Sequence, residues 1–125
     1  MSETLRGGDA VLHSELPLEL LHRGKVRDVY AVDADTLLMV ASDRVSAFDV
    51  VMGRPVPRKG EVLTLITAWW MAQLDGRVPH HLLAVDPDVI AARHPQLAAS
   101  REAWARRAML VRRTTPVLVE CIVRG

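Results

Sequence analysis

Apolar residues occur along this chain in short runs that are separated by charged or glycine-containing segments. Between His22 and Val32, alternating polar and β-forming residues predict two half-buried antiparallel strands joined by a turn. Asp33 to Asp35 favour a second turn, and the apolar run from Thr36 to Ala41 is short enough to predict a buried strand rather than a helix. Together these strands predict an antiparallel meander.

A helical pattern follows the meander. Apolar residues return at helical spacing between Glu61 and Gln73, and Asp75-Gly76 ends the pattern. The paired tryptophans Trp69 and Trp70 in this helix are more often core or domain-contact groups than a ligand platform. Pro87 opens a second short helix over residues 88–93, and helical character continues over residues 96–107.

The remaining runs favour β-structure. Val78 to Val85 predicts a strand, and the runs 108–113 and 116–124 flank Thr114-Thr115 and predict a closing hairpin of the sheet. The chain is therefore predicted to be α+β, an antiparallel sheet with a few helices. Residues 1–10 are polar and contain glycine, so we expect a flexible tail, with one domain over residues 11–125.

Composition narrows the class of protein. With 125 residues, 50% of them hydrophobic and 25% charged, the chain fits one globular domain. The net charge of +1 gives no general attraction to nucleic acid or to an anionic membrane. Cys121 has no second cysteine for an intrachain disulfide, and no stretch reaches the roughly 18 apolar residues of a spanning helix. We therefore expect a cytoplasmic protein without nucleic-acid or membrane partners.

Two lysines stand out among 16 basic residues, Lys25 and Lys59. Either arginine cannot replace lysine at these two positions, or the shortage of lysine reflects an arginine-rich proteome. The histidines at 80, 81 and 94 lack the spacing of a ligand set, and no cysteine and histidine cluster has zinc-site spacing. We therefore assign no metal ligand to the chain.

The segment RGKVRDVY, residues 23–30, has the composition of a phosphate cradle. Gly24 allows close approach of the backbone to an anion, Lys25 supplies a mobile charge, and Arg27 can bind two oxygens at once. The segment is neither a Walker loop nor a GxGxxG fingerprint, and a hairpin folded over phosphates is its closest physical analogue. The alternative is an exposed hairpin with solvated charges.

Three further segments carry candidate chemistry. SDRVSAFD, residues 42–49, offers hydroxyls and carboxylates for gripping a polar metabolite, although turns and caps use the same residues. RKGEVLT, residues 58–64, places Lys59 at a helix N-terminus, where it either binds an anion or belongs to a cap. Glu120 and Arg124 fall on one face of a predicted strand, where they either orient a phosphate-bearing substrate or pair with each other.

In this order, RGKVRDVY, SDRVSAFD, RKGEVLT and VECIVRG resemble the phosphoribosylaminoimidazole-succinocarboxamide synthases, the SAICAR synthetase family of purine biosynthesis. The resemblance runs from about Leu20 to Gly125 and includes the tryptophan helix. It implies an N-terminal lobe similar to a kinase small lobe and to ATP-grasp proteins. It also implies a ligase that joins carboxyaminoimidazole ribotide to L-aspartate, with Mg²⁺ and with ATP split to ADP and phosphate.

The resemblance implies roles for individual residues. Lys25, with Gly24 and Arg27, lies over the ATP phosphates and lowers their repulsion of the incoming carboxylate, so that an acyl phosphate forms. Ser46 and Asp49 face the reaction centre, where they are catalytic together with Lys25. The other implied contacts are Lys59 in the same anionic cleft, Arg112 and Thr114 beside the adenine, and Glu120 and Arg124 at the ribotide.

The chain departs from the family pattern in two places. Leu118 stands where the family usually has proline, with Pro116 displaced upstream, and the family's second lobe would follow Gly125. That lobe carries the metal carboxylates and much of the aspartate site. We therefore expect a nucleotide-binding lobe that is inactive without its C-terminal partner. The alternative is a stand-alone nucleotide-binding or regulatory module without catalysis.

Overall fold

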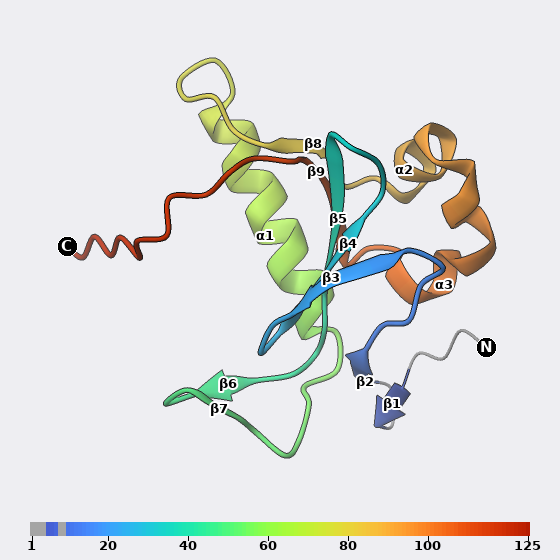
Figure 1. Cartoon of the computed structure of the whole chain (residues 1–125). Coiled ribbons are helices and arrows are strands. Elements are labelled where there is room, and N and C mark those ends of the chain that lie inside the picture. The colour runs from blue at the N-terminus through green and yellow to red at the C-terminus, as the bar shows by residue number, and fades with distance from the viewer. Residues whose placement is uncertain (1–4, 8–9) are drawn as a thin grey trace.

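A five-stranded antiparallel sheet forms the centre of the molecule, with strand order β3-β4-β5-β9-β8 (Figure 1). The computed structural model describes residues 5–7 and 10–125. The strands of this sheet are β3 (Glu19–Arg23), β4 (Arg27–Ala31), β5 (Thr36–Ala41), β8 (Leu82–Ala84) and β9 (Ala108–Arg112). Two small sheets pair β1 (Leu5–Gly7) with β2 (Ala10–His13), and β6 (Ser46–Ala47) with β7 (Val50–Val51).

Helices lie on both sides of the central sheet. They are α1 (Lys59–Leu74), α2 (Pro87–Arg93), the 3₁₀ helix η1 (Pro95–Ser100) and α3 (Arg101–Trp104). Helix α1 lies on one side of the sheet, and α2, η1 and α3 lie on the other (Figure 1). The α+β class predicted from the sequence is therefore confirmed.

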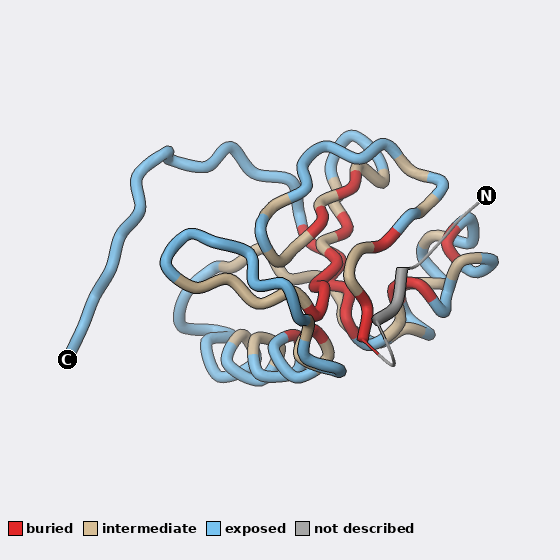
Figure 2. The backbone as a smooth tube through the Cα atoms, turned by 90° about the horizontal axis from the view of Figure 1, so that it is seen from below, coloured by how far each residue is buried: buried red, intermediate tan, exposed pale blue. Residues whose placement is uncertain are grey.

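The hydrophobic core lies between the sheet and the α2 to α3 segment. Because side chains alternate along a strand, Tyr30, Leu38 and Leu110 project to the same face of three adjacent strands and are buried. Trp104 is fully buried against this face, and its indole Nε1 donates to the Leu97 carbonyl at 3.0 Å. Most of the buried stretches run through the middle of the molecule (Figure 2).

Most predicted elements are present. The hairpin within 22–32, the strand Thr36–Ala41 and the helix within 61–73 are confirmed, as is the short helix over residues 88–93. The predicted strand over 78–85 shortens to Leu82–Ala84, because residues 75–80 form the turn after α1. Trp69 and Trp70 are not core residues here, since they are 57% and 58% exposed and stack edge to face on each other.

The predicted closing hairpin is wrong. Strand β9 forms as expected, but residues 116–124 form no strand and are exposed. The sheet order explains the failure, since β9 pairs with β5 on one edge and β8 on the other. No edge of β9 remains for a following strand, so the apolar run after Pro116 extends away from the sheet (Figure 1).

Part of the predicted tail 1–10 is outside the described residues, namely residues 1–4 and 8–9. Within the described part, Leu5–Gly7 already pairs with β2, so regular structure begins before Val11.

Candidate functional site

The turn between β3 and β4 meets the segment that follows β5. Three successive carbonyls of the turn accept hydrogen bonds from this segment. The Gly24 and Lys25 carbonyls bind the Arg44 guanidinium at 3.0 and 2.9 Å, and the Val26 carbonyl binds the Ser42 amide at 2.9 Å. Inside the turn, the Gly24 amide donates to the Arg27 carbonyl at 2.7 Å. The two charged segments read from the sequence therefore form one structural unit.

Lys25 reaches across to the β6-β7 hairpin. Its Nζ lies 2.5 Å from Oδ1 of Asp49, although the Lys25 side chain is half exposed and the Asp49 side chain almost fully exposed. Hydrogen bonding to Lys25, and then its positive charge, hold the pKa of Asp49 below its ordinary value. Asp49 and the preceding Phe48 have φ values of 61° and 52°, which match the left-handed backbone of a tight hairpin turn. The turn thus places a carboxylate beside the candidate phosphate-binding lysine.

Lys59, the other lysine, belongs to the same cluster. Its Nζ donates to the Arg44 carbonyl at 2.9 Å, rather than to a carboxylate. Burial lowers the pKa of Lys59, and although Asp43 raises it, the positive charges of Arg27 and Arg44 lower it again. Several cations therefore face one another at this end of the sheet. An anion bound among them would relieve their repulsion.

Asp43 lies next to Arg44 in the chain and is fully buried. Its carboxylate accepts from the amides of Val11 and Gly60, each at 2.8 Å, and from Nη1 of Arg107 at 2.9 Å. Burial raises the pKa of Asp43, but Arg107 and the backbone donors lower it more, so the net shift is downward. This ionised carboxylate joins β2, the start of α1 and the residue before β9. Its role is structural, although the sequence counted it among the groups for gripping a metabolite.

Asp28 anchors the hairpin in the same way. Its carboxylate binds the Ser14 amide at 3.1 Å and the guanidinium groups of Arg23 and Arg44, each at 3.1 Å. Burial raises the pKa of Asp28, but the Ser14 amide and the two arginines lower it further, so it is ionised at neutral pH. The buried charge is therefore balanced by the arginine that also holds the turn.

The remaining candidates near the turn are less tightly held. Ser46 lies in β6 opposite Val51 and is half-buried. Arg27 begins β4 opposite Ala41 and is half-buried, close enough to Lys59 to affect its pKa. Five candidate residues therefore lie around the turn, namely Gly24, Lys25, Arg27, Asp49 and Lys59. Their binding and catalytic roles stay predictions.

Arg112 and Thr114 lie at the opposite end of the sheet. Arg112 pairs with Thr36 at the start of β5, whereas Arg27 beside the turn pairs with Ala41 at its end. The two ends are about 17 Å apart along the strand, at roughly 3.4 Å per residue. The Arg112 amide donates to the His81 carbonyl at 2.8 Å, and Thr114 is exposed. A site that uses both ends must hold an elongated molecule.

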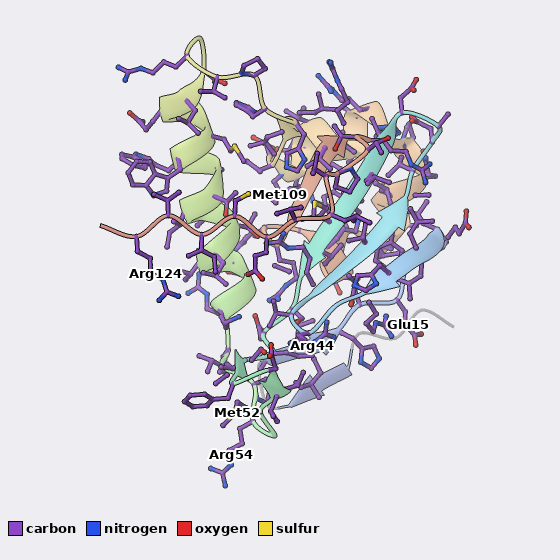
Figure 3. The ribbon with its side chains drawn as sticks, turned by 60° about the vertical axis from the view of Figure 1, so that its left-hand side comes forward. Glu15, Arg44, Met52, Arg54, Met109 and Arg124 are labelled. Carbon is purple, nitrogen blue, oxygen red and sulfur yellow. The ribbon has the colours of Figure 1, made fainter. Side chains whose placement is uncertain are left out.

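Glu120 and Arg124 do not join the cluster. The prediction that they share one face of a strand is wrong, because residues 113–125 contain no strand and both side chains are exposed. Arg124 lies on the terminal segment, away from Arg44 (Figure 3).

Two residues of the network were missed in the sequence, Arg44 and Arg107. A weak signal existed for each. Arg44 follows Asp43 directly after the buried strand β5, and Arg107 directly precedes the buried strand β9. A charged residue at the end of a buried strand often pairs with another. No local pattern in the sequence identifies the partner of either arginine.

Among the described residues, no group of three or more histidine, cysteine, aspartate or glutamate side chains could hold a metal ion. No helix in the described part of the chain is long and apolar enough to cross a membrane.

Comparison with known proteins identifies the family. The SAICAR synthetase family model matches residues 20–125. The phosphoribosylaminoimidazole-succinocarboxamide synthase of Methylibium petroleiphilum is 54% identical over 108 residues, which are 86% of this chain and 34% of that protein. The enzyme of the same name from Azoarcus is 50% identical over 108 residues, again 86% of this chain, and 33% of that protein.

Solved structures agree. A SAICAR synthase from Saccharomyces cerevisiae in complex with SAICAR superposes with a TM-score of 0.69 and 40% identity, over 77% of this chain and 33% of that one. A second SAICAR synthase gives a TM-score of 0.70 at 37% identity, over 80% of this chain and 36% of that one. The chain spans about a third of the length of the relatives it matches. By sequence and by fold, this chain belongs to the SAICAR synthetase family.

Proposed function

We propose that the chain supplies the triphosphate-binding part of an ATP-dependent ligase of purine biosynthesis. The reaction would join carboxyaminoimidazole ribotide to L-aspartate and give SAICAR, ADP and phosphate. One observation carries the proposal: Lys25, Arg27, Arg44 and Lys59 gather around the β3-β4 turn. Burial, and then the charges of Arg27 and Arg44 against that of Asp43, lower the pKa of Lys59. Such a cluster favours a multiply charged anion.

The residues fit a nucleoside triphosphate in both charge and extent. The lysines and Arg27 would hold the phosphates, while Arg112 and Thr114 at the far end of the sheet would lie beside the base. An extended nucleotide has a length comparable to the separation between these two ends. ATP supplies the phosphoryl group that activates a carboxylate for attack by an amine.

The chain's own residues would act by charge and position. The Lys25 ammonium would reduce the repulsion between the phosphates and the incoming carboxylate. Lys59 would add positive charge to the same cleft, and Ser46 and Asp49 would line the side where the carboxylate and amine meet. Mg²⁺ would accompany the nucleotide, and we assign none of its ligands to this chain.

Glu120 and Arg124 would meet the ribotide only after the terminal segment folds against further structure. In the relatives, about two thirds of the length lies outside the part matched here. We propose that a C-terminal lobe, corresponding to the unmatched part of the relatives, completes the site. The 125-residue chain would be inactive without that lobe. The whole enzyme would act in the cytoplasm.

The direct test is a reaction of the complete gene product that contains this sequence with ATP, carboxyaminoimidazole ribotide and L-aspartate. We expect ADP and SAICAR in equal amounts, with no ADP when the ribotide is left out and no SAICAR when aspartate is left out. A folded product that binds ATP without forming SAICAR would contradict the proposal and favour a nucleotide-binding module without catalysis.

A further inference from the structure

The Arg44 side chain is almost completely used in holding the turn. It is 12% exposed, and all three guanidinium nitrogens donate hydrogen bonds. Nε binds the Lys25 carbonyl at 2.9 Å, Nη1 binds the Leu12 carbonyl at 2.7 Å, and Nη2 binds the Gly24 carbonyl at 3.0 Å and the Asp28 carboxylate at 3.1 Å. This side chain therefore joins β2, the turn and β4 (Figure 3, Arg44).

These bonds fix the orientation of two peptide groups in the turn. In a trans peptide, the carbonyl and the following N–H point in opposite directions. Because the Gly24 and Lys25 carbonyls point at Arg44, the N–H groups of Lys25 and Val26 point away from it. Successive N–H groups turned to one side of a turn form an anion-binding surface.

Arg44 also connects the turn to the second lysine. Its own carbonyl accepts from Nζ of Lys59 at 2.9 Å. The Arg44 side chain thus holds the conformation of the backbone around Lys25. The Arg44 carbonyl holds the Lys59 ammonium.

We infer that Arg44 is a positioning residue that holds the β3-β4 turn in the shape that binds nucleotide phosphates. This inference rests on the proposed function. Arg44 would not touch the nucleotide, because its donors are already occupied by the turn. Its side chain acts through the turn backbone, whereas the bond to Lys59 is made by the main-chain carbonyl of residue 44.

An alternative role would be purely electrostatic. Asp28 is buried, and Arg44 is one of two arginines that balance its charge. A lysine at position 44 keeps a positive charge near Asp28 but lacks the planar fork that reaches several acceptors at once. Arg44→Lys and Arg44→Gln therefore separate the two roles.

The test compares wild type, Arg44→Gln, Arg44→Lys and a control, Arg77→Gln, in the complete gene product. Arg77 is exposed and lies beyond the opposite end of α1 from Lys59. The measurements are urea denaturation, hydrogen exchange of residues 23–27 and of β9, and calorimetric titration with MgADP.

For Arg44→Gln we expect MgADP to bind about 10- to 100-fold more weakly, the scale of effect that a misplaced binding group produces. Exchange at Gly24, whose amide donates to the Arg27 carbonyl inside the turn, becomes faster while β9 remains protected. Arg44→Lys recovers most of the lost stability but not the affinity. Arg77→Gln matches wild type.

Recovery of affinity together with stability in Arg44→Lys would overturn the inference and leave only charge balance. Unchanged exchange in the turn, or unchanged affinity in Arg44→Gln, would also overturn it while the proposed function stands. If wild type itself does not bind MgADP, the proposed function fails and the inference fails with it.

Discussion

The Nη1 atom of Arg107 lies 2.9 Å from Oδ1 of Asp43, although 64 residues separate them in the chain. The same nitrogen donates to the Ala41 carbonyl at 3.0 Å, and the amide of Gly60 binds the same carboxylate oxygen at 2.8 Å. The end of β5, the start of α1 and the approach to β9 are thereby fixed to one another. Lys59 and the segment that holds the turn both depend on this junction.

Arg107→Ala should lower the free energy of unfolding by about 3 kcal/mol, because it leaves the buried Asp43 carboxylate without its charged partner. Urea denaturation measures this. The exposed Arg54, on the loop before α1, supplies the control, and Arg54→Ala should change stability by less than about 0.5 kcal/mol. Equal effects of the two substitutions would show that the junction contributes little.

Gly60 is placed where a side chain cannot fit. A Cβ there would overlap the Ala41 carbonyl and would lie 2.7 Å from Nη1 of Arg107 and 2.9 Å from the Ser42 carbonyl. Gly60→Ala should therefore cost about 1 to 3 kcal/mol through overpacking. Gly53 is the matched control, because a Cβ there meets nothing within 4 Å. Thermal unfolding of the two variants measures the change in stability. A loss of stability in Gly53→Ala as large as that in Gly60→Ala would count against the packing argument.

Acid should unfold the domain through Asp28 and Asp43. Both have folded-state pKa values below the ordinary 3.8. A carboxyl with a depressed folded pKa contributes stability that is complete above the unfolded value and is lost as the pH falls through the folded value. The urea midpoint should therefore be nearly constant between about pH 7 and 5 and should fall below about pH 4. Asp28→Asn should make the fall shallower, and an identical fall in both proteins would contradict the role of Asp28.

The ion pair between Lys25 and Asp49 should compete with nucleotide phosphates. Asp49→Asn removes the competing charge, and asparagine tolerates the φ of 61° at this position. MgADP should then bind about two- to fivefold more tightly at low salt, since exposed ion pairs are weak. The difference should shrink as salt is added. Calorimetric titration measures it, and weaker binding by the variant would show that Asp49 assists the nucleotide instead of competing.

Local patterns were enough to predict the hairpin, β5 and α1. Each is defined by residues close in sequence: alternation in β4, an apolar run in β5, and helical spacing before Gly76 in α1. The left-handed φ of 76° at Gly76 agrees with the helix end placed there. The same local signals predicted a strand after Pro116, and there they failed. Whether a β-prone run pairs depends on a free sheet edge, and β8 occupies that edge of β9.

The candidate site was predicted in part for the same reason. Lys25, Asp49 and Lys59 come from short motifs that can be read directly. Arg44 and Arg107 act through partners 16 or more residues away, at Asp28 and Asp43 respectively, so no local pattern reveals them. The tryptophans illustrate the reverse error: Trp104, not Trp69 or Trp70, fills the core of this chain.

We propose that the β3-β4 turn binds nucleotide phosphates through Lys25. Calorimetric titration of MgADP into the complete gene product, wild type and Lys25→Ala, tests this role of Lys25. Loss of a charged phosphate contact should weaken binding by at least about tenfold, or 1.4 kcal/mol. Stability should be unchanged, because the Lys25 side chain is half exposed. Equal affinity for MgADP in two equally folded proteins would show that Lys25 does not bind the phosphates.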